Sequence, residues 1–211
     1  MLIVVFNIGN LSYSEPAIEI LSDYFNKYNL KYEIVTDVSK FNVKNAHPSW
    51  MKMLSYKMFP DNDFIFNWDL DLLPLNSTPN IEDYTDFSKL NMCYDSSVVL
   101  GYEVYNPKTF KYNGGLIGVP KSLGKWCENI YNQYAPGTYP SYEQYYLNDE
   151  ICKDHIDVNR LPDKLNTLYP KQQDGWDLWN KSFIRHYSFG GFQNPPSMFE
   201  TISKHREEYF T

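Results

Sequence analysis

The stretch NDFIFNWDLDLLPLN, residues 62–76, places two aspartates directly after an apolar run. The run at 63–68 predicts a buried strand, because it is short, continuous and apolar. Asp69 and Asp71 follow at its end, separated by one leucine. Two carboxylates this close suit a hard cation such as Mg²⁺ or Mn²⁺, which commonly completes its shell with phosphate oxygens. A D-x-D pair alone also fits plain solvation of a strand end, so its context decides.

The preceding sequence predicts where this strand lies in a sheet. LIVVF at 2–6 is typical of a strand buried on both faces, and KYEIVTD at 31–37 predicts a second strand. Apolar residues at helical spacing predict one helix beginning at Ser14 and another that ends before Pro60. Alternating strands and helices indicate a doubly wound α/β fold, which binds ligands at the carboxyl ends of its parallel strands. The aspartate pair stands at such an end.

The second half of the chain is less regular. GGLIGV at 114–119 predicts a strand, the segments 121–134 and 143–154 predict helices, and a Pro- and aromatic-rich tail follows. We expect a single domain over 1–211. Its front half, about 1–75, would bind a nucleotide, and its back half, about 90–211, would shape a second pocket.

Composition excludes several classes of protein. A chain of 211 residues with 43% hydrophobic content can bury a core. Its net charge of -7 argues against nucleic-acid binding, and the apolar run at the N-terminus is too short to span a membrane. Cys93, Cys127 and Cys152 are scattered, which favours free thiols in a reducing compartment. We expect a cytoplasmic protein that is monomeric or part of a longer polypeptide.

Four motifs in order carry a resemblance to a known family. WDLD at 68–71, YNGGLIGVP at 112–120, YEQYYLNDE at 142–150 and IRHYSFGG at 184–191 together resemble the GT-A fold glycosyltransferases, over nearly the whole chain. The resemblance implies an α/β fold with a central, mostly parallel mixed sheet flanked by helices. It also implies Mn²⁺- or Mg²⁺-dependent transfer of a sugar from a UDP-sugar donor to a hydroxyl of a glycan or glycoprotein acceptor.

The resemblance assigns a metal site. Asp69, Asp71 and His186 would hold the metal-diphosphate, and Gly190 and Gly191 would let the backbone approach the diphosphate. A late histidine beside a D-x-D pair resembles retaining members, in which the departing phosphate can receive the acceptor proton.

Donor contacts are expected around this metal. A carboxylate such as Asp37 can accept from uracil N3–H or a ribose hydroxyl, although it could instead cap a helix. Lys57 is preferred to Lys52 as a basic contact. Asn113 with its glycines would bind sugar hydroxyls, and a hairpin turn is the alternative. The expected donor-binding residues are Phe6, Asn7, Ile8, Asp37, Lys57, Trp68, Leu70, Asn113, Gly114, Gly115 and Gln144.

Acidic residues in the second half are candidates for catalysis. Glu143 and Gln144 match an acidic-Gln pair beside the donor sugar, although relatives more often carry Asp-Gln. Asp149 is a further candidate near the anomeric carbon. An inverting enzyme would need a carboxylate base, for which Glu143, Asp149 or Asp174 would serve.

Aromatic residues near the C-terminus suggest an acceptor site. Trp176, Trp179 and Tyr187, with Asp174 and Asp177, are plausible walls for a sugar ring, whose apolar face stacks on aromatics. Core packing is the alternative for each ring.

Two other functions fit parts of the sequence. With 19 tyrosines and five tryptophans, the chain could be a non-catalytic carbohydrate-binding module. The DLD triplet also occurs in phosphatases with an aspartyl nucleophile, but there it usually follows the first strand and continues to Thr or Val. Here it follows the third strand and continues LLP.

Overall fold

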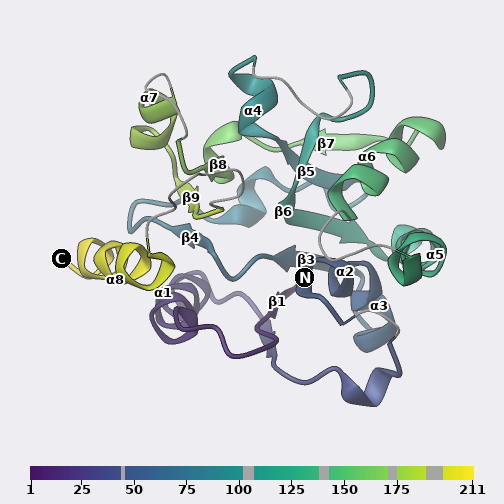
Figure 1. Ribbon diagram of the computed structural model, residues 1–211, viewed down its shortest axis with the longest axis horizontal. Helices are drawn as coiled ribbons and strands as arrows, with labels where there is room; N and C mark the ends of the chain where they lie inside the picture. The colour runs from purple at the N-terminus through teal and green to yellow at the C-terminus, as the bar shows by residue number, and fades with distance from the viewer. Residues whose placement is uncertain (44–45, 102–106, 138–142, 171–174, 189–196) are drawn as a thin grey trace.

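The computed structural model shows a layered α/β molecule, with helices on both faces of a central sheet and a smaller sheet beside it (Figure 1). The structure describes residues 1–43, 46–101, 107–137, 143–170, 175–188 and 197–211.

The main sheet is mixed and mostly parallel. Its strands are β1 (Leu2–Phe6), β2 (Tyr32–Val35), β3 (Phe64–Trp68), β5 (Leu90–Tyr94), β6 (Tyr112–Pro120) and β7 (Val158–Arg160), in the order β2-β1-β3-β6-β5-β7. β1 is parallel to β2 and β3, and β5 is parallel to β7. Only β6 is antiparallel to its two neighbours. This arrangement confirms the predicted fold class.

The continuous apolar runs form strands because both of their faces are covered. All five residues of β1 are buried, and so are all five of β3. Ile3 and Val5 pack in one core with α1 (Ser14–Lys27), whereas Leu2 and Val4 pack in a second core on the other face. Successive side chains of a strand point to opposite faces, so one strand supplies both cores.

Helices from both halves of the chain cover the second core. The expected helix before Pro60 consists of three consecutive short segments, and the two helices expected later are confirmed. No helix in the described ranges is both long enough and apolar enough to cross a membrane. The helices after α1 are α2 (Pro48–Met51), α3 (Ser55–Met58), α4 (Ser96–Val99), α5 (Gly124–Tyr134), α6 (Glu143–Lys153), α7 (Gly175–Asn180) and α8 (Met198–Tyr209), with 3₁₀ turns at Ser39–Phe41, Lys52–Leu54, Ile81–Tyr84, Lys121–Leu123, Ala135–Gly137 and Asp163–Leu165.

A second sheet joins the C-terminal part of the chain to the D-x-D segment. It has the order β4-β9-β8, formed by β4 (Leu72–Pro74), β9 (Ile184–His186) and β8 (Thr167–Leu168). β4 begins immediately after the aspartate pair and is antiparallel to β9, and their register pairs Leu72 with His186. This register carries the late histidine to the aspartates.

The C-terminal tail contains a helix that the sequence analysis did not predict. Ser197 caps the start of α8, where its hydroxyl accepts a hydrogen bond from the Glu200 N–H. α8 packs against α1, as Figure 1 shows, and an ion pair between Arg206 and Glu19 joins the two helices.

Candidate functional site

The D-x-D segment is a turn held by backbone hydrogen bonds. The Asp69 N–H donates to the carbonyl of Gly115 on β6 (2.9 Å), and the Leu72 N–H donates back to the Asp69 carbonyl (3.0 Å). The carbonyl of Asp71 accepts from the Tyr187 N–H, just after β9 (2.9 Å). Bonds to two different strands therefore fix the positions from which both carboxylates project.

Three side chains gather at this turn. Asp69, Asp71 and His186 each offer a ligand atom, and these atoms lie within 4.8 Å of one another. His186 Nε2 is 3.5 Å from Asp71 Oδ1. Two carboxylate oxygens and an imidazole nitrogen form a donor set suited to Mn²⁺ or Mg²⁺, with further coordination positions left for water or phosphate oxygens. The structure thus brings together the three residues expected to hold a metal; we call them the metal cluster.

A buried chain of hydrogen bonds orients His186. Its Nδ1 lies 2.9 Å from Asn166 Oδ1, the Asn166 amide donates to Asn113 Oδ1 (2.8 Å), and the Asn113 amide donates to Asp95 Oδ2 (2.9 Å). An ionised carboxylate only accepts, so Asp95 orients both amides and places the imidazole proton on Nδ1. When the ring is neutral, the lone pair of Nε2 therefore faces Asp71, as a metal ligand requires.

Gly115 makes room for this chain. A Cβ at this position would lie 2.6 Å from His186 Cε1 and 2.9 Å from Asn113 Oδ1. At Gly114 a Cβ would lie 2.8 Å from Glu143 Oε1. The glycines lie inside β6 rather than in a hairpin turn, and they allow functional side chains to approach the backbone.

A lysine lies beside the metal cluster, and it is Lys52 rather than Lys57. The Lys52 side chain is 1% exposed, and its Nζ contacts Asp69 Oδ1 (2.8 Å), the Gly114 carbonyl (2.6 Å) and Glu143 Oε1 (3.2 Å). Lys57 is exposed on α3. Lys52 lies in the 3₁₀ turn Lys52–Leu54 and is buried, whereas Lys57 lies in α3 and faces solvent, so the two lysines do not share a face.

The metal cluster has unusual protonation energetics. Burial and the neighbouring Asp71 raise the pKa of Asp69 to about 6, against the lowering effect of Lys52. Burial would also raise the pKa of Asp71, but His186 brings that pKa below its usual value, and Asp71 raises the pKa of His186 in return. Burial and both aspartates raise the pKa of Tyr13, which precedes α1. The crowded negative charge favours a bound cation.

The acidic candidates divide into two groups. Glu143, buried at the start of α6, lies beside Lys52, and Gln144 Oε1 accepts a hydrogen bond from the Gly114 N–H (2.7 Å). Asp149 lies more than one turn further along α6 and accepts a hydrogen bond from the Thr109 hydroxyl instead. The structure therefore joins Glu143 and Gln144 to the site but not Asp149. Gly190, Gly191 and Asp174 lie outside the described residues.

Solved structures share this architecture. A glycosyltransferase involved in glycosylation of the major capsid of PBCV-1 matches with a TM-score of 0.68 and 15% identity, over 96% of this chain and 98% of that one. The fold is that of the GT-A glycosyltransferases. The galactosyltransferase LgtC in complex with donor and acceptor sugar analogs matches with a TM-score of 0.57 and 13% identity, over 100% and 97% of the two chains.

A third structure with the GT-A fold contains bound ligands. It is a mutant of Drosophila β1,4-galactosyltransferase 7 in complex with manganese, UDP-Gal and xylobiose. It matches with a TM-score of 0.50 and 13% identity, over 95% of this chain and 79% of that one. No protein-family profile and no curated protein sequence matches the chain.

Some expected donor contacts of this GT-A chain belong to its core. Phe6 and Leu70 are each 4% exposed and Trp68 is fully buried, so their side chains pack in the core. The Trp68 indole N–H donates to the Leu72 carbonyl (2.6 Å), which helps to hold the D-x-D turn. Ile8 is partly buried against the second core.

Polar candidates lie at the ends of β1 and β2. Asn7 Oδ1 accepts a hydrogen bond from the Ser14 hydroxyl (2.8 Å), which joins the end of β1 to α1. Asp37 Oδ1 accepts from the Ser39 N–H (2.8 Å), a local bond made from the residue before Val38, which is the N-cap of the following 3₁₀ turn. Asp37 and Thr36 also line a cavity of about 240 Å³ along β2.

The aromatic candidates come together away from the metal cluster. Trp176, Trp179 and Tyr187 line one cavity with Arg185. Along β9, Arg185 and Tyr187 point to the face opposite His186. The rings expected to form an acceptor wall therefore line a shared cavity on the side of the small sheet that faces away from His186.

Sequence reasoning missed Asn166 and Asp95, which orient the metal-cluster histidine. The local signal is a polar residue next to a strand: Asn166 directly precedes β8, and Asp95 directly follows β5. Lys52 had a clearer sequence signal, because the helical segment that carries it leads directly to β3, the strand before the two aspartates.

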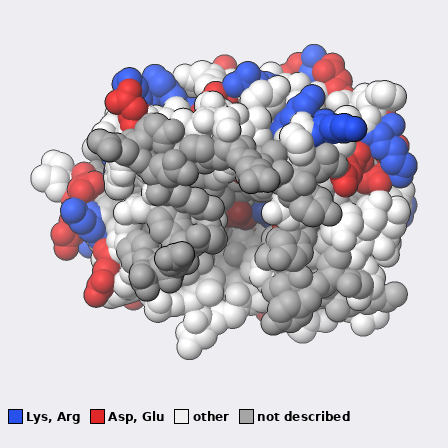
Figure 2. Space-filling model, turned by 45° about the horizontal axis from the view of Figure 1, so that its top comes forward, with Lys and Arg blue, Asp and Glu red and all other residues white. Residues whose placement is uncertain are grey.

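A recess in the molecular surface contains charged side chains. Figure 2 shows acidic and basic groups within a hollow near the centre of one face, whereas most other charges on this face lie near its edge. Positive and negative groups of the described residues are mixed along that edge.

Proposed function

We propose that this protein is a glycosyltransferase that moves a sugar from a UDP-sugar to a glycan hydroxyl and depends on Mn²⁺. The observation that carries the proposal is the metal cluster at the carboxyl end of β3, in a chain with the GT-A fold. The GT-A structure in complex with manganese and UDP-Gal supports the choice of ion and nucleotide.

The residues present fit a divalent ion. Asp69 and Asp71 supply hard oxygen ligands, and the hydrogen bond from Nδ1 to Asn166 leaves Nε2 of His186 available. When bound, the ion would supply positive charge to offset the charge that the diphosphate gains as the anomeric C–O bond breaks. Lys52 holds Asp69 in position through a 2.8 Å contact.

We propose that the anomeric configuration is retained. The C–O bond to the diphosphate breaks, a C–O bond to the acceptor forms on the same face, and the acceptor proton passes to a phosphate oxygen. Glu143 is paired with Lys52, and Asp149 accepts from Thr109, so both carboxylates are already engaged. This disfavours either as the general base that inversion would require.

The remaining assignments complete the proposal. The front half would bind the nucleotide, with Asn7 and Asp37 at the nucleoside end, while Glu143 and Gln144 would lie beside the donor sugar. The Tyr- and Asn-rich composition resembles a chlorella-virus glycosyltransferase domain within a larger protein, and the PBCV-1 likeness supports a viral origin. The free cysteines support a reducing compartment, which would be the host cytoplasm.

Activity with a panel of UDP-sugars tests the proposal. UDP release in the presence of glycan acceptors should require Mn²⁺, stop on chelation and be lost in Asp71→Asn. Proton NMR of the product would report the anomeric configuration, and inversion would refute the retaining mechanism alone. UDP release that persists equally in Asp71→Asn would refute the role of the metal cluster.

A further inference from the structure

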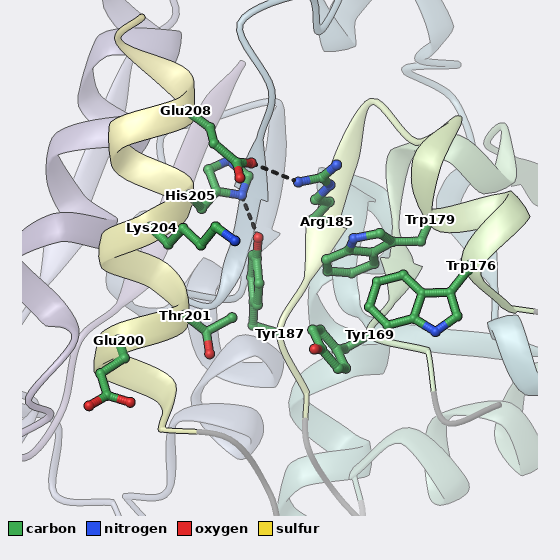
Figure 3. Close-up of a pocket in the computed structure, with 10 residues that line it drawn as sticks. All are labelled: Tyr169, Trp176, Trp179, Arg185, Tyr187, Glu200, Thr201, Lys204, His205 and Glu208. Atoms are coloured by element: carbon green, nitrogen blue, oxygen red, sulfur yellow. Dashed lines mark hydrogen bonds and ion pairs between the residues drawn. The ribbon is translucent and has the colours of Figure 1, made fainter. Parts of the chain in front are cut away.

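A cavity of about 440 Å³ lies between α7, α8 and the small sheet (Figure 3). Arg185 and Tyr187 enter it from β9, whereas the side chain between them, His186, faces the metal cluster. Tyr169 enters from the end of β8, whose register pairs Thr167 with Arg185. The cavity and the metal cluster therefore lie on opposite faces of the small sheet.

One side of the cavity is aromatic. Trp179 is 4% exposed and Tyr187 is 2% exposed, whereas Trp176 is 42% exposed. Ring centroids are 5.7 Å apart for Tyr169 and Trp176, and 6.5 Å apart for Trp176 and Trp179. Figure 3 shows both tryptophans across the cavity from α8. The buried rings hold Trp176 in place while part of its surface stays available to a ligand.

The opposite side, formed by α8, is charged but balanced. Among the described lining residues, Glu200 and Glu208 are acidic, and Lys204 and Arg185 are basic. Arg185 pairs with Glu208 (3.4 Å), and its guanidinium lies 5.0 Å from the centre of the Trp179 ring. The Arg185 guanidinium thus already occupies the cation position beside the Trp179 ring, and the two acidic side chains offset the two basic ones. The cavity therefore favours a neutral ligand with many hydrogen-bonding groups.

A buried hydrogen-bonded chain fixes the base of the cavity. Tyr187 Oη lies 2.6 Å from His205 Nδ1, and His205 Nε2 lies 2.8 Å from the Pro74 carbonyl. Burial lowers the pKa of His205 to about 4, so the ring is neutral near pH 7. Nε2 then donates to Pro74, and the Tyr187 hydroxyl donates to Nδ1. A wall fixed in this way loses little conformational entropy when a ligand binds.

We propose that this cavity binds a neutral sugar residue of a glycan, at a site separate from the metal cluster. The apolar C–H face of a sugar ring would stack on Trp176, and its hydroxyls would bond to the polar side chains of α8. The volume lies within the roughly 300–1,000 Å³ typical of small-molecule sites. The site does not depend on glycosyl transfer, and binding needs neither Mn²⁺ nor UDP.

Fluorine NMR on fluorotryptophan-labelled protein tests this site. Lactose, maltose, cellobiose and xylobiose are titrated without metal or nucleotide, with choline and glucuronate as charged comparisons. We expect at least one neutral disaccharide to shift the Trp176 resonance with millimolar affinity. Trp176→Ala, followed through the Trp179 resonance, should abolish that binding because the ring on which the sugar stacks is gone, and this exposed ring can be removed without unfolding the protein. Trp126→Ala on α5 should retain binding.

Several results would overturn the site. They are the absence of any shift with the four disaccharides, preferential binding of choline or glucuronate, and unchanged disaccharide affinity in Trp176→Ala. Asp71→Asn separates this site from the metal cluster. Disaccharide binding should persist in that variant, and its loss would place the sugar at the cluster instead.

Discussion

Removing the Asn166 side chain should weaken metal binding without removing a metal ligand. Asn166→Ala deletes the acceptor 2.9 Å from His186 Nδ1 and the donor 2.8 Å from Asn113 Oδ1. The imidazole then loses the bond that sets its tautomer and orientation. Losing such a partner typically costs about 10- to 100-fold in metal affinity, equivalent to roughly 1.4–2.8 kcal/mol.

Titration of Mn²⁺ followed by electron paramagnetic resonance measures this loss, and nitrogen chemical shifts of His186 in the metal-free protein report its tautomer. Asn166→Asp keeps an acceptor for Nδ1 and should recover much of the affinity. A purely structural role would not predict this recovery, since Asp cannot donate to Asn113.

A matched control separates metal binding from stability. Asn159 on β7 donates to the Tyr84 carbonyl and to Asn91 Oδ1, and none of these residues belongs to the metal cluster. Asn159→Ala should lower the thermal unfolding midpoint but leave Mn²⁺ affinity unchanged. Wild-type Mn²⁺ affinity and an unchanged His186 tautomer in folded Asn166→Ala would refute the reasoning.

Three further changes give separate expectations. Lys52→Met leaves the partner carboxylate of Asp69 unpaired and should lower the free energy of unfolding by about 3 kcal/mol without metal, with part restored by Mn²⁺. Gly115→Ala places a methyl group against the His186 ring and should reduce Mn²⁺ affinity at least about tenfold. The pKa of His205 is lowered from 6.5 to about 4, so the unfolded chain takes up this proton first as the pH falls. The free energy of unfolding should therefore drop by roughly 3 kcal/mol from pH 7 to pH 4, and His205→Gln should remove this component.

Control variants for the lysine and glycine changes come from the same chain. Lys57→Met removes an exposed lysine and should have little effect on unfolding. A Cβ at Gly114 comes closer than 3.0 Å only to the carboxylate end of the Glu143 side chain, so Gly114→Ala should bind Mn²⁺ more tightly than Gly115→Ala does. Equal losses in the two glycine variants would contradict the steric argument, and an unchanged pH dependence in His205→Gln would contradict a neutral buried imidazole.

The front of the fold could be predicted because its signals are local. The strands β1 and β3 are continuous apolar runs, and the amphipathic spacing of α1 is regular. The small sheet could not be predicted in this way, since β4, β8 and β9 have only two or three residues each and form through long-range pairing. α8 did carry a signal, because Ser197 followed three residues later by Glu200 matches a capping box.

The candidate site also combines residues with a local sequence signal and residues placed by long-range strand pairing. The Asp69 and Asp71 pair is visible in sequence as a motif at a strand end, whereas the role of Asn166 depends on the register between β8 and β9. That register places Asn166 next to the strand carrying His186. Whether Lys52 or Lys57 faces the metal cluster depends on which side of the helix each lysine projects from. Three short segments in place of one regular helix made that side hard to predict from sequence.

Calorimetric titration of UDP, GDP and CMP with and without Mn²⁺, on the wild type and on Asp71→Asn, tests the central claim most directly. The account predicts that UDP alone binds, that it requires Mn²⁺, and that the substitution abolishes binding. Absence of nucleotide binding under every condition, or UDP binding that is indifferent to both Mn²⁺ and Asp71, would contradict it.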